Sequence, residues 1–148
     1  MHGFSQADTN TVNKWNQEAL DLAYSDPKRA MELSEKALKL SQKLGFSRGE
    51  VRALIRKGIV YDVQSKNDQA IDMYQQSLQL AKKTQDQKAI ASNLNNLGLI
   101  YWKKSELTEA LTYFNRAYSM FGALEDEYNM ASAANNLGLI YEEMELYR

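Results

Sequence analysis

The chain has 148 residues, of which 44% are hydrophobic and 25% charged, and its formal net charge is −1. It contains no cysteine, which excludes disulfide bonds and thiolate chemistry. The balanced charge provides no field that would draw the chain to nucleic acid, and no apolar run approaches the roughly 18 residues of a membrane span. We therefore expect a globular domain that binds neither nucleic acid nor membrane through this segment.

Residues 1–8 are predicted to form a disordered N-terminal tail. The run Phe4-Ser5-Gln6-Ala7 within it has two interpretations. It is either a frayed terminus or the boundary left by a signal peptide that was removed before Ser5-Gln6. The compartment therefore stays open, cytoplasmic under the first interpretation and periplasmic under the second.

Apolar residues spaced three and four apart predict seven helices in the rest of the chain. Asp26 and Pro27 suit the N-cap and the first position of the second helix, and Gly45 suits the C-terminal cap of that helix. Ser47-Arg48-Gly49-Glu50 fits a capping box that opens the third helix. The predicted helices run near 9–24, 27–43, 48–64, 68–83, 87–104, 106–121 and 125–146.

Start and stop signals for the later helices are weaker. Asn67 or Asp68 is expected to cap the fourth helix, and Ser105 the sixth. Gly122 is expected to end the sixth helix.

The chain repeats itself. The seven residues Asn95–Tyr101 recur without change forty residues later, at Asn135–Tyr141, and Lys57–Tyr61 is an echo forty residues earlier. A fixed period of this size indicates stacked units of helix A, a turn, helix B and a longer turn.

The residues with this spacing resemble the tetratricopeptide repeat. The copy around Gly58 has Lys57 where leucine is usual, and the closing proline of the family is absent. The period exceeds the family's usual value of about 34 residues. It is similar to the variants in kinesin light chains, bacterial peptide-sensing regulators and the sensor regions of some bacterial histidine kinases. The positions that carry the resemblance are Leu94, Leu97, Gly98, Tyr101, Ala110, Phe114 and Ala117, with Leu54, Gly58, Tyr61, Ala70 and Tyr74 one unit earlier.

The resemblance implies an all-α fold, a right-handed superhelical α-α solenoid of about 3.5 repeats. The repeat domain is expected over 9–148. Its last unit is truncated, because the final helix A has no helix B after it although its apolar face is complete. The repeats are expected at about 9–46, 47–86, 87–126 and 127–148.

The resemblance also implies a concave groove. It would be lined by the face of each helix A that lies next to its buried core face. On this face Leu20, Ile59, Leu99 and Leu139 would form an aliphatic ridge beside an amide ladder of asparagines. The residues expected to line the groove are Asn16, Arg52, Ile55, Arg56, Ile59, Asp62, Ser92, Asn95, Asn96, Leu99, Trp102, Ser132, Asn135, Asn136, Leu139 and Glu142, with Asn13 and Ala23 on the same face of the first helix.

Each of these side chains also has a purely structural interpretation. The asparagines serve either a peptide backbone or the packing between repeats. Trp102 either anchors a ligand or covers the next repeat. Arg52 and Arg56 either receive a carboxylate or phosphate, or form a solvated face.

A binding function follows from this pattern. His2, the only histidine, lies in the predicted tail, and there is no cysteine, so we expect no Ser/His/Asp or Cys/His catalytic set, no enzyme, and no cofactor or metal site. The expected function is a protein- or peptide-binding scaffold, the sensor or partner-binding region of a larger bacterial signalling protein. The alternative is self-association, as a homodimer formed through the unfinished C-terminal helix.

Overall fold

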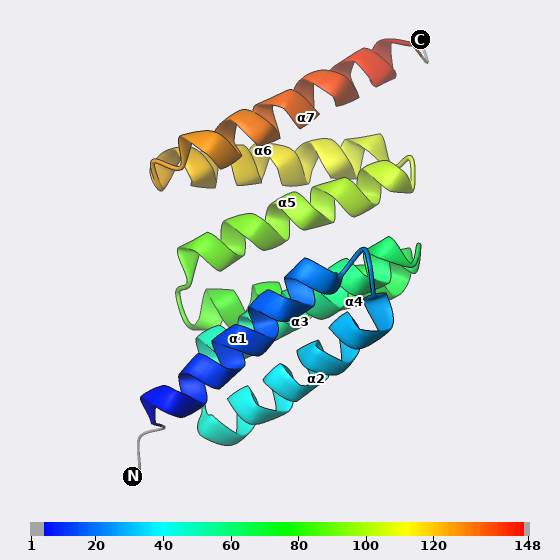
Figure 1. Ribbon diagram of the computed structural model, residues 1–148. Coiled ribbons are helices and arrows are strands. Elements are labelled where there is room, and N and C mark those ends of the chain that lie inside the picture. The colour runs from blue at the N-terminus through cyan, green and yellow to red at the C-terminus, as the bar shows by residue number, and fades with distance from the viewer. Residues whose placement is uncertain (1–4, 147–148) are drawn as a thin grey trace. The chain divides into compact units, whose positions relative to one another are not determined.

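The computed structural model describes residues 5–146, and over this range the chain forms seven α-helices and no strand (Figure 1). This confirms the predicted all-α class, with helix ends that differ from the prediction by at most three residues. The helices are α1 Gln6–Leu22, α2 Pro27–Leu44, α3 Ser47–Val63, α4 Asn67–Lys83, α5 Gln87–Lys103, α6 Leu107–Ala123 and α7 Glu127–Leu146. Within 5–146, none of the helices combines the length and apolar character that crossing a bilayer requires.

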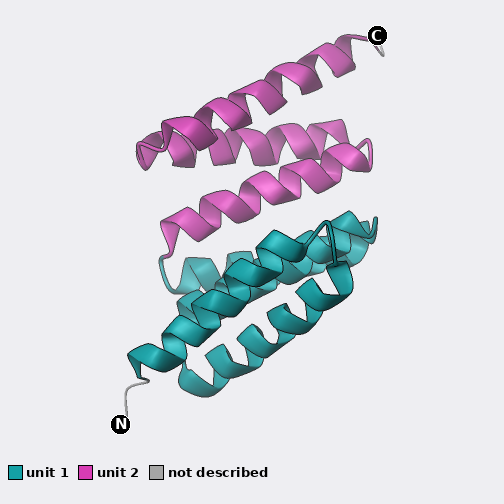
Figure 2. Cartoon of the chain, viewed as in Figure 1, with its two compact units in different colours: residues 1–85 teal, residues 86–148 magenta. Residues whose placement is uncertain are grey.

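The helices divide into two compact units. Helices α1–α4 form the first unit, and α5–α7 form the second (Figure 2). In each unit, consecutive helices pack against one another as antiparallel neighbours joined by short turns. In the first unit α1 also contacts α3, so the two A helices lie side by side.

The first helix begins earlier than predicted. The Ser5 hydroxyl accepts a hydrogen bond from the backbone N–H of Asp8 at 3.2 Å and caps α1, which starts at Gln6. The predicted tail is therefore wrong for residues 6–8, while residues 1–4 lie outside the described part of the chain. At α2 the caps agree with the prediction, because Asp26 accepts from the N–H of Arg29 and Gly45 has a left-handed φ of 67°.

The remaining caps differ from the prediction. Phe46, Lys66 and Glu106 occupy the N-cap positions of α3, α4 and α6, and none of them makes a side-chain capping bond. The capping box at Ser47 and the caps at Asn67, Asp68 and Ser105 are therefore wrong, and α6 runs one residue past Gly122. The turns use backbone bonds instead. A single residue with positive φ follows each helix from α2 to α6: Gly45, Ser65, Gln85, Ser105 and Glu125.

These turns recur every twenty residues. In four of them, the N–H after the positive-φ residue donates to a carbonyl five residues back, as Lys66 does to Tyr61 at 2.8 Å and Glu106 to Tyr101 at 2.9 Å. Such a Schellman-type bond satisfies the helix end without any capping side chain. We expected the turn from helix A to helix B to be shorter than the turn from helix B to the next helix A. This is wrong, because three residues separate the helices at both kinds of turn from α3 onward.

In the first unit, glycine allows α3 to approach its neighbours closely. A Cβ atom at Gly58 would lie 2.5 Å from Cε1 of Tyr74 on α4, a side chain that is 1% exposed. A Cβ atom at Gly49 would lie 2.7 Å from Val12 on α1. Val12, Ala37 and Ala53 are fully buried at the centre of this unit, with Trp15 and Phe46 packed against them.

In the second unit, the close approach at a glycine recurs on α5 but not on α7. A Cβ atom at Gly98 would lie 2.9 Å from the ring of Phe114 on α6, and Tyr101 stacks on Tyr113 with ring centroids 5.3 Å apart. At Gly138 on α7, the equivalent Cβ atom would meet no described atom within 4 Å. Tyr141, the counterpart of Tyr101, is 52% exposed. One side of α7 is therefore uncovered in this part of the chain.

Candidate functional site

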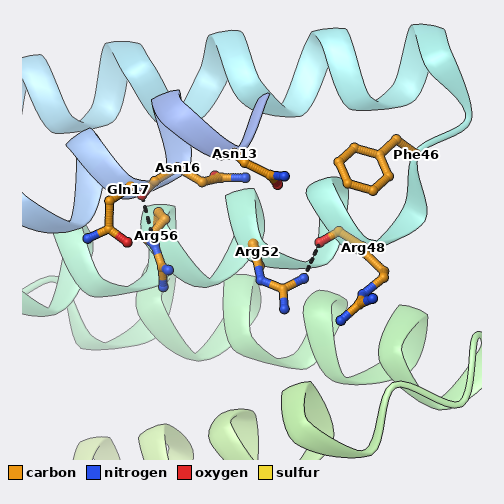
Figure 3. Close-up of a pocket in the computed structure, with 7 residues that line it drawn as sticks. All are labelled: Asn13, Asn16, Gln17, Phe46, Arg48, Arg52 and Arg56. Atoms are coloured by element: carbon orange, nitrogen blue, oxygen red, sulfur yellow. Dashed lines mark hydrogen bonds between the residues drawn. The ribbon is translucent and has the colours of Figure 1, made fainter. Parts of the chain in front are cut away.

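A pocket of about 360 Å3 lies between α1 and α3 in the first unit (Figure 3). Four of its lining residues belong to the predicted groove face, namely Asn13, Asn16, Arg52 and Arg56. It is lined by Asn13, Asn16, Gln17, Phe46, Arg48, Arg52 and Arg56.

One face of α3 supplies the positive charge of this pocket. Arg48, Arg52 and Arg56 are spaced by four residues, which places them one above the other on a helix. Figure 3 shows them following one another along α3, with Asn13 and Gln17 on α1 beside them. We call these three side chains the arginine ladder.

Asn16 holds α1 against α3. Its side chain is 2% exposed, and its Nδ2 donates to the carbonyl oxygen of Gly49 at 3.2 Å. The backbone carbonyl oxygen of Asn16 accepts from Nε of Arg56 at 3.0 Å. The amide group that we expected to face a ligand at this position is therefore used between helices. The exposed amides of the pocket come from Asn13 and Gln17 instead.

The electrostatics of the pocket are one-sided. None of its seven lining residues is acidic, and within residues 5–146 no carboxylate lies within 4.0 Å of the arginine ladder. Burial, and then the positive charge of Arg52, hold the pKa of the Arg56 guanidinium below its usual value, while Asp21 and Tyr74 act in the opposite direction. An anion bound here would offset both the burial and the repulsion.

The other predicted residues of the first unit do not line this pocket. Ile55 is buried with 6% exposed, and Ile59 and Asp62 are partly buried. The ridge residue Ile59 and its neighbours Ile55 and Asp62 therefore remain predicted groove residues.

In the second unit, the two identical sequence copies have different surroundings. Trp102 on α5 donates from Nε1 to Oε2 of Glu143 on α7 at 2.6 Å and meets the ring of Phe114 edge-on at 6.4 Å. It thus covers the next repeat, one of its two predicted roles. Leu99 packs against the buried cluster of Ala110, Phe114 and Ile140.

Exposure increases from α5 to α7. Ser92, Asn95 and Asn96 on α5 are partly buried, as is Asn136 on α7. The amide ladder of this unit remains a prediction, and of its α7 asparagines only Asn135 is exposed. The exposed members of the predicted set on α7 are Ser132, Asn135, Leu139 and Glu142.

Sequence reasoning missed three lining residues, Gln17, Phe46 and Arg48. The signal for Arg48 was present, because Arg48, Arg52 and Arg56 share a spacing of four. It was missed because Ser47-Arg48-Gly49-Glu50 was interpreted as a cap, which put Arg48 at a helix boundary. Phe46 comes from the turn before α3 and could be placed in the pocket only by the packing of α2 on α3.

No cluster of three or more His, Cys, Asp or Glu side chains that could hold a metal ion is found in the described range. The pocket donors are guanidinium and amide groups, which bind anions and peptide groups rather than metal ions.

Comparisons with known proteins agree with the helix pairs. Two sequence models described as Tetratricopeptide repeat match residues 53–88 and 89–148, which together make up roughly two thirds of the chain. No curated protein matches its sequence. Among solved structures, the chain is similar to the crystal structure of BtubC (BKLC) from P. vanneervenii, with 23% identity and a TM-score of 0.61. That match covers 95% of this chain and 68% of BtubC, and it supports the fold.

Proposed function

The chain belongs to the tetratricopeptide repeat family, and on that premise we propose that it binds a segment of a partner protein in the pocket between α1 and α3. Tetratricopeptide repeats generally mediate protein–protein interaction or scaffolding, and proteins built from them are generally non-catalytic. The proposal adds a location and a chemistry to that general role.

The arginine ladder is the observation that supports this location. Three guanidinium groups share a pocket with no acidic lining residue, beside the exposed amides of Asn13 and Gln17. Guanidinium groups bind carboxylates through paired hydrogen bonds, and amides match the donor and acceptor of a peptide backbone. A peptide segment would use both kinds of group together.

Selection of random peptides displayed on phage tests the proposal. Peptides selected against the chain should lose about tenfold or more in affinity for Arg48→Gln/Arg52→Gln, because charge-assisted hydrogen bonds are lost. The matched control is Lys39→Gln/Lys43→Gln, which changes the charge equally in a separate groove formed with Trp15 and Leu40. Peptides that bind both double variants equally well would place the binding site elsewhere.

The wider role that we propose is a sensor or partner-binding region of a larger bacterial signalling protein. Support comes from the resemblance of the repeat spacing to the sensor regions of bacterial histidine kinases and to bacterial peptide-sensing regulators. Reading the complete gene tests this role. A kinase or DNA-binding domain in the same reading frame would agree with it, and a frame that encodes repeats alone would contradict it.

Self-association is the second candidate function, and the uncovered side of α7 favours it. Gly138 meets no described atom there, and Tyr141, three residues further along the same side, is 52% exposed. Exposed apolar groups on one side of a helix commonly mark an interaction surface. A second copy of the chain would be the partner.

A further inference from the structure

The arginine ladder has a regular step. Helix α3 is continuous from Ser47 to Val63. Since an α-helix rises 1.5 Å per residue, four residues advance about 6 Å. Arg48, Arg52 and Arg56 therefore present positive charge at three points, spaced at about 6 Å along one wall of the pocket.

An extended peptide has nearly the same step. Its residues rise about 3.3 Å each and its side chains alternate between two sides. Side chains on one side therefore recur about every 6.6 Å. Over two steps the mismatch with the ladder is roughly 1 Å. The long arginine side chains can absorb a difference of this size. A segment with acidic residues at alternate positions could thus pair one carboxylate with each arginine.

The hydrogen-bond donors of the ladder are largely unused. Arg56 donates from Nε to Asn16, which leaves both terminal nitrogens available, and Arg52 donates once from a terminal nitrogen to the carbonyl oxygen of Arg48 at 3.3 Å. Each guanidinium carries five N–H donors. Arg52 and Arg56 therefore keep enough donors to bind a carboxylate through two of them.

The wall opposite the ladder has a matching step. Asn13 and Gln17 are also separated by four residues, on α1, and both side chains are exposed. The side chains at the other alternate positions of an extended segment would face Asn13 and Gln17, whose Nε2 donates to Oδ1 of Asp21 at 3.0 Å, while its acidic side chains faced α3. Acidic residues at every fourth position of a helical segment would also match the ladder, so experiment distinguishes the two conformations.

We infer that the pocket takes an extended segment of a partner protein with aspartate or glutamate at alternate positions, one carboxylate for each arginine of the ladder. This inference rests on the proposed function and specifies its ligand. It distinguishes a matched spacing from general attraction between a basic pocket and an acidic chain.

Three isomeric, fluorescently labelled peptides of glutamate and serine test the inference. They share one composition, with three glutamates placed at alternate positions, in one block, or at every fourth position. Fluorescence anisotropy with the full chain at low ionic strength should show the alternating peptide binding about fivefold or more tighter than either isomer, because only that peptide pairs all three arginines. Equal affinities for the three isomers would overturn the inference.

Variants of the chain connect this preference to the pocket. Arg48→Gln/Arg52→Gln should weaken binding of the alternating peptide about tenfold or more and abolish its advantage, whereas Lys39→Gln/Lys43→Gln should change its affinity less than about twofold. Arg52→Lys keeps the charge but loses paired hydrogen bonds, so it should weaken binding about threefold. Retained preference in Arg48→Gln/Arg52→Gln would overturn the inference.

Three further outcomes separate failure of this inference from failure of the proposed function. Equal binding of all three isomers that is nevertheless lost in Arg48→Gln/Arg52→Gln would refute the alternating pattern and leave a basic peptide pocket. Displacement of the alternating peptide by inorganic phosphate as effectively as by unlabelled peptide would show a small-anion site and contradict a peptide register. Peptides from the phage library whose affinity is unchanged in Arg48→Gln/Arg52→Gln would refute the proposed function itself.

Discussion

Three glycines at equivalent positions have different tasks. Gly58 and Gly98 lie against aromatic rings, where an added Cβ would come within 2.5 Å of Tyr74 and 2.9 Å of Phe114. Gly138 has the same sequence neighbours as Gly98, yet no described atom lies within 4 Å of its Cβ position. The requirement for glycine is therefore set by the neighbouring helix rather than by the local backbone.

A pair of alanine substitutions tests this difference. Gly98→Ala should lower the free energy of unfolding by about 1–3 kcal/mol, because Phe114 is fully buried and cannot move away. Gly138→Ala should raise it by about 0.5–1 kcal/mol, because alanine favours the helix and meets no neighbour. Denaturant unfolding followed by circular dichroism measures both. Destabilisation by Gly138→Ala would mean that a partner covers α7 in solution.

Tyr74 gives the first unit a dependence on alkaline pH. Burial, followed by Asp62 and Tyr24, raises the pKa of its hydroxyl above the usual value of 10.0, with Arg56 acting in the opposite direction. A group whose pKa is higher in the folded state contributes its full stability below the unfolded-state pKa and loses it as pH rises. Stability should therefore decline once pH exceeds about 10.

Thermal unfolding at pH values from about 8 to 11 measures this decline. Tyr74→Phe removes the titrating hydroxyl, so its melting temperature should fall less over the same range than that of the unmodified chain. Parallel curves for the two proteins would refute the assignment to Tyr74. Other tyrosines, including Tyr101, whose pKa burial also raises, contribute equally to both curves.

At the scale of the element, the turns set the geometry of the repeats. Five positive-φ residues follow successive helices at intervals of twenty residues, and only Gly45 among them is glycine. Ser65, Gln85, Ser105 and Glu125 hold the left-handed conformation at a cost, since a Cβ atom disfavours it by roughly 1–2 kcal/mol. Backbone bonds such as that from Glu106 to Tyr101 at 2.9 Å maintain it.

Glycine substitution in a turn should release this cost. Ser105→Gly should raise the free energy of unfolding by about 0.5–1 kcal/mol, because the relief of strain exceeds the added freedom of the unfolded chain. Gly45→Ala should have the opposite sign at a φ of 67°. Denaturant midpoints compare the two variants with the unmodified chain. A loss of stability in Ser105→Gly would refute the assignment of strain to this turn.

At the scale of the whole molecule, the proposed functions differ in the oligomeric state they require. Partner binding in the first unit is compatible with a monomer. Self-association needs the uncovered side of α7, where Gly138 has no described neighbour within 4 Å and Tyr141 is 52% exposed. The oligomeric state of the chain without any ligand therefore distinguishes the two functions.

Light scattering across a concentration series provides that measurement. If a second copy covers α7, the weight-average mass should rise with concentration, and Tyr141→Ser should return it to the monomer value because apolar contact area is lost. Tyr24→Ser is the control, since Tyr24 is 79% exposed on the first unit. A monomeric mass at every concentration would refute self-association.

The sequence by itself determined the helices and their alternation. Hydrophobic spacing and the cap at Asp26-Pro27 act within one or two turns of helix, and the glycine that recurs every forty residues is visible in the sequence. Both can be recognised without coordinates. The same local rules, together with the geometry that the family resemblance implies, predicted a groove face on each A helix, and four residues of that face, Asn13, Asn16, Arg52 and Arg56, line the candidate pocket.

Only the tertiary structure decided what those side chains do. Asn16 bonds to Gly49 across the α1–α3 contact, and Trp102 bonds to Glu143, so both are used within the fold. The copies at Gly98 and Gly138 share their sequence but differ in burial, because burial depends on the neighbouring helix. The pocket likewise combines α1, α3 and the turn at Phe46, segments that local periodicity treats separately.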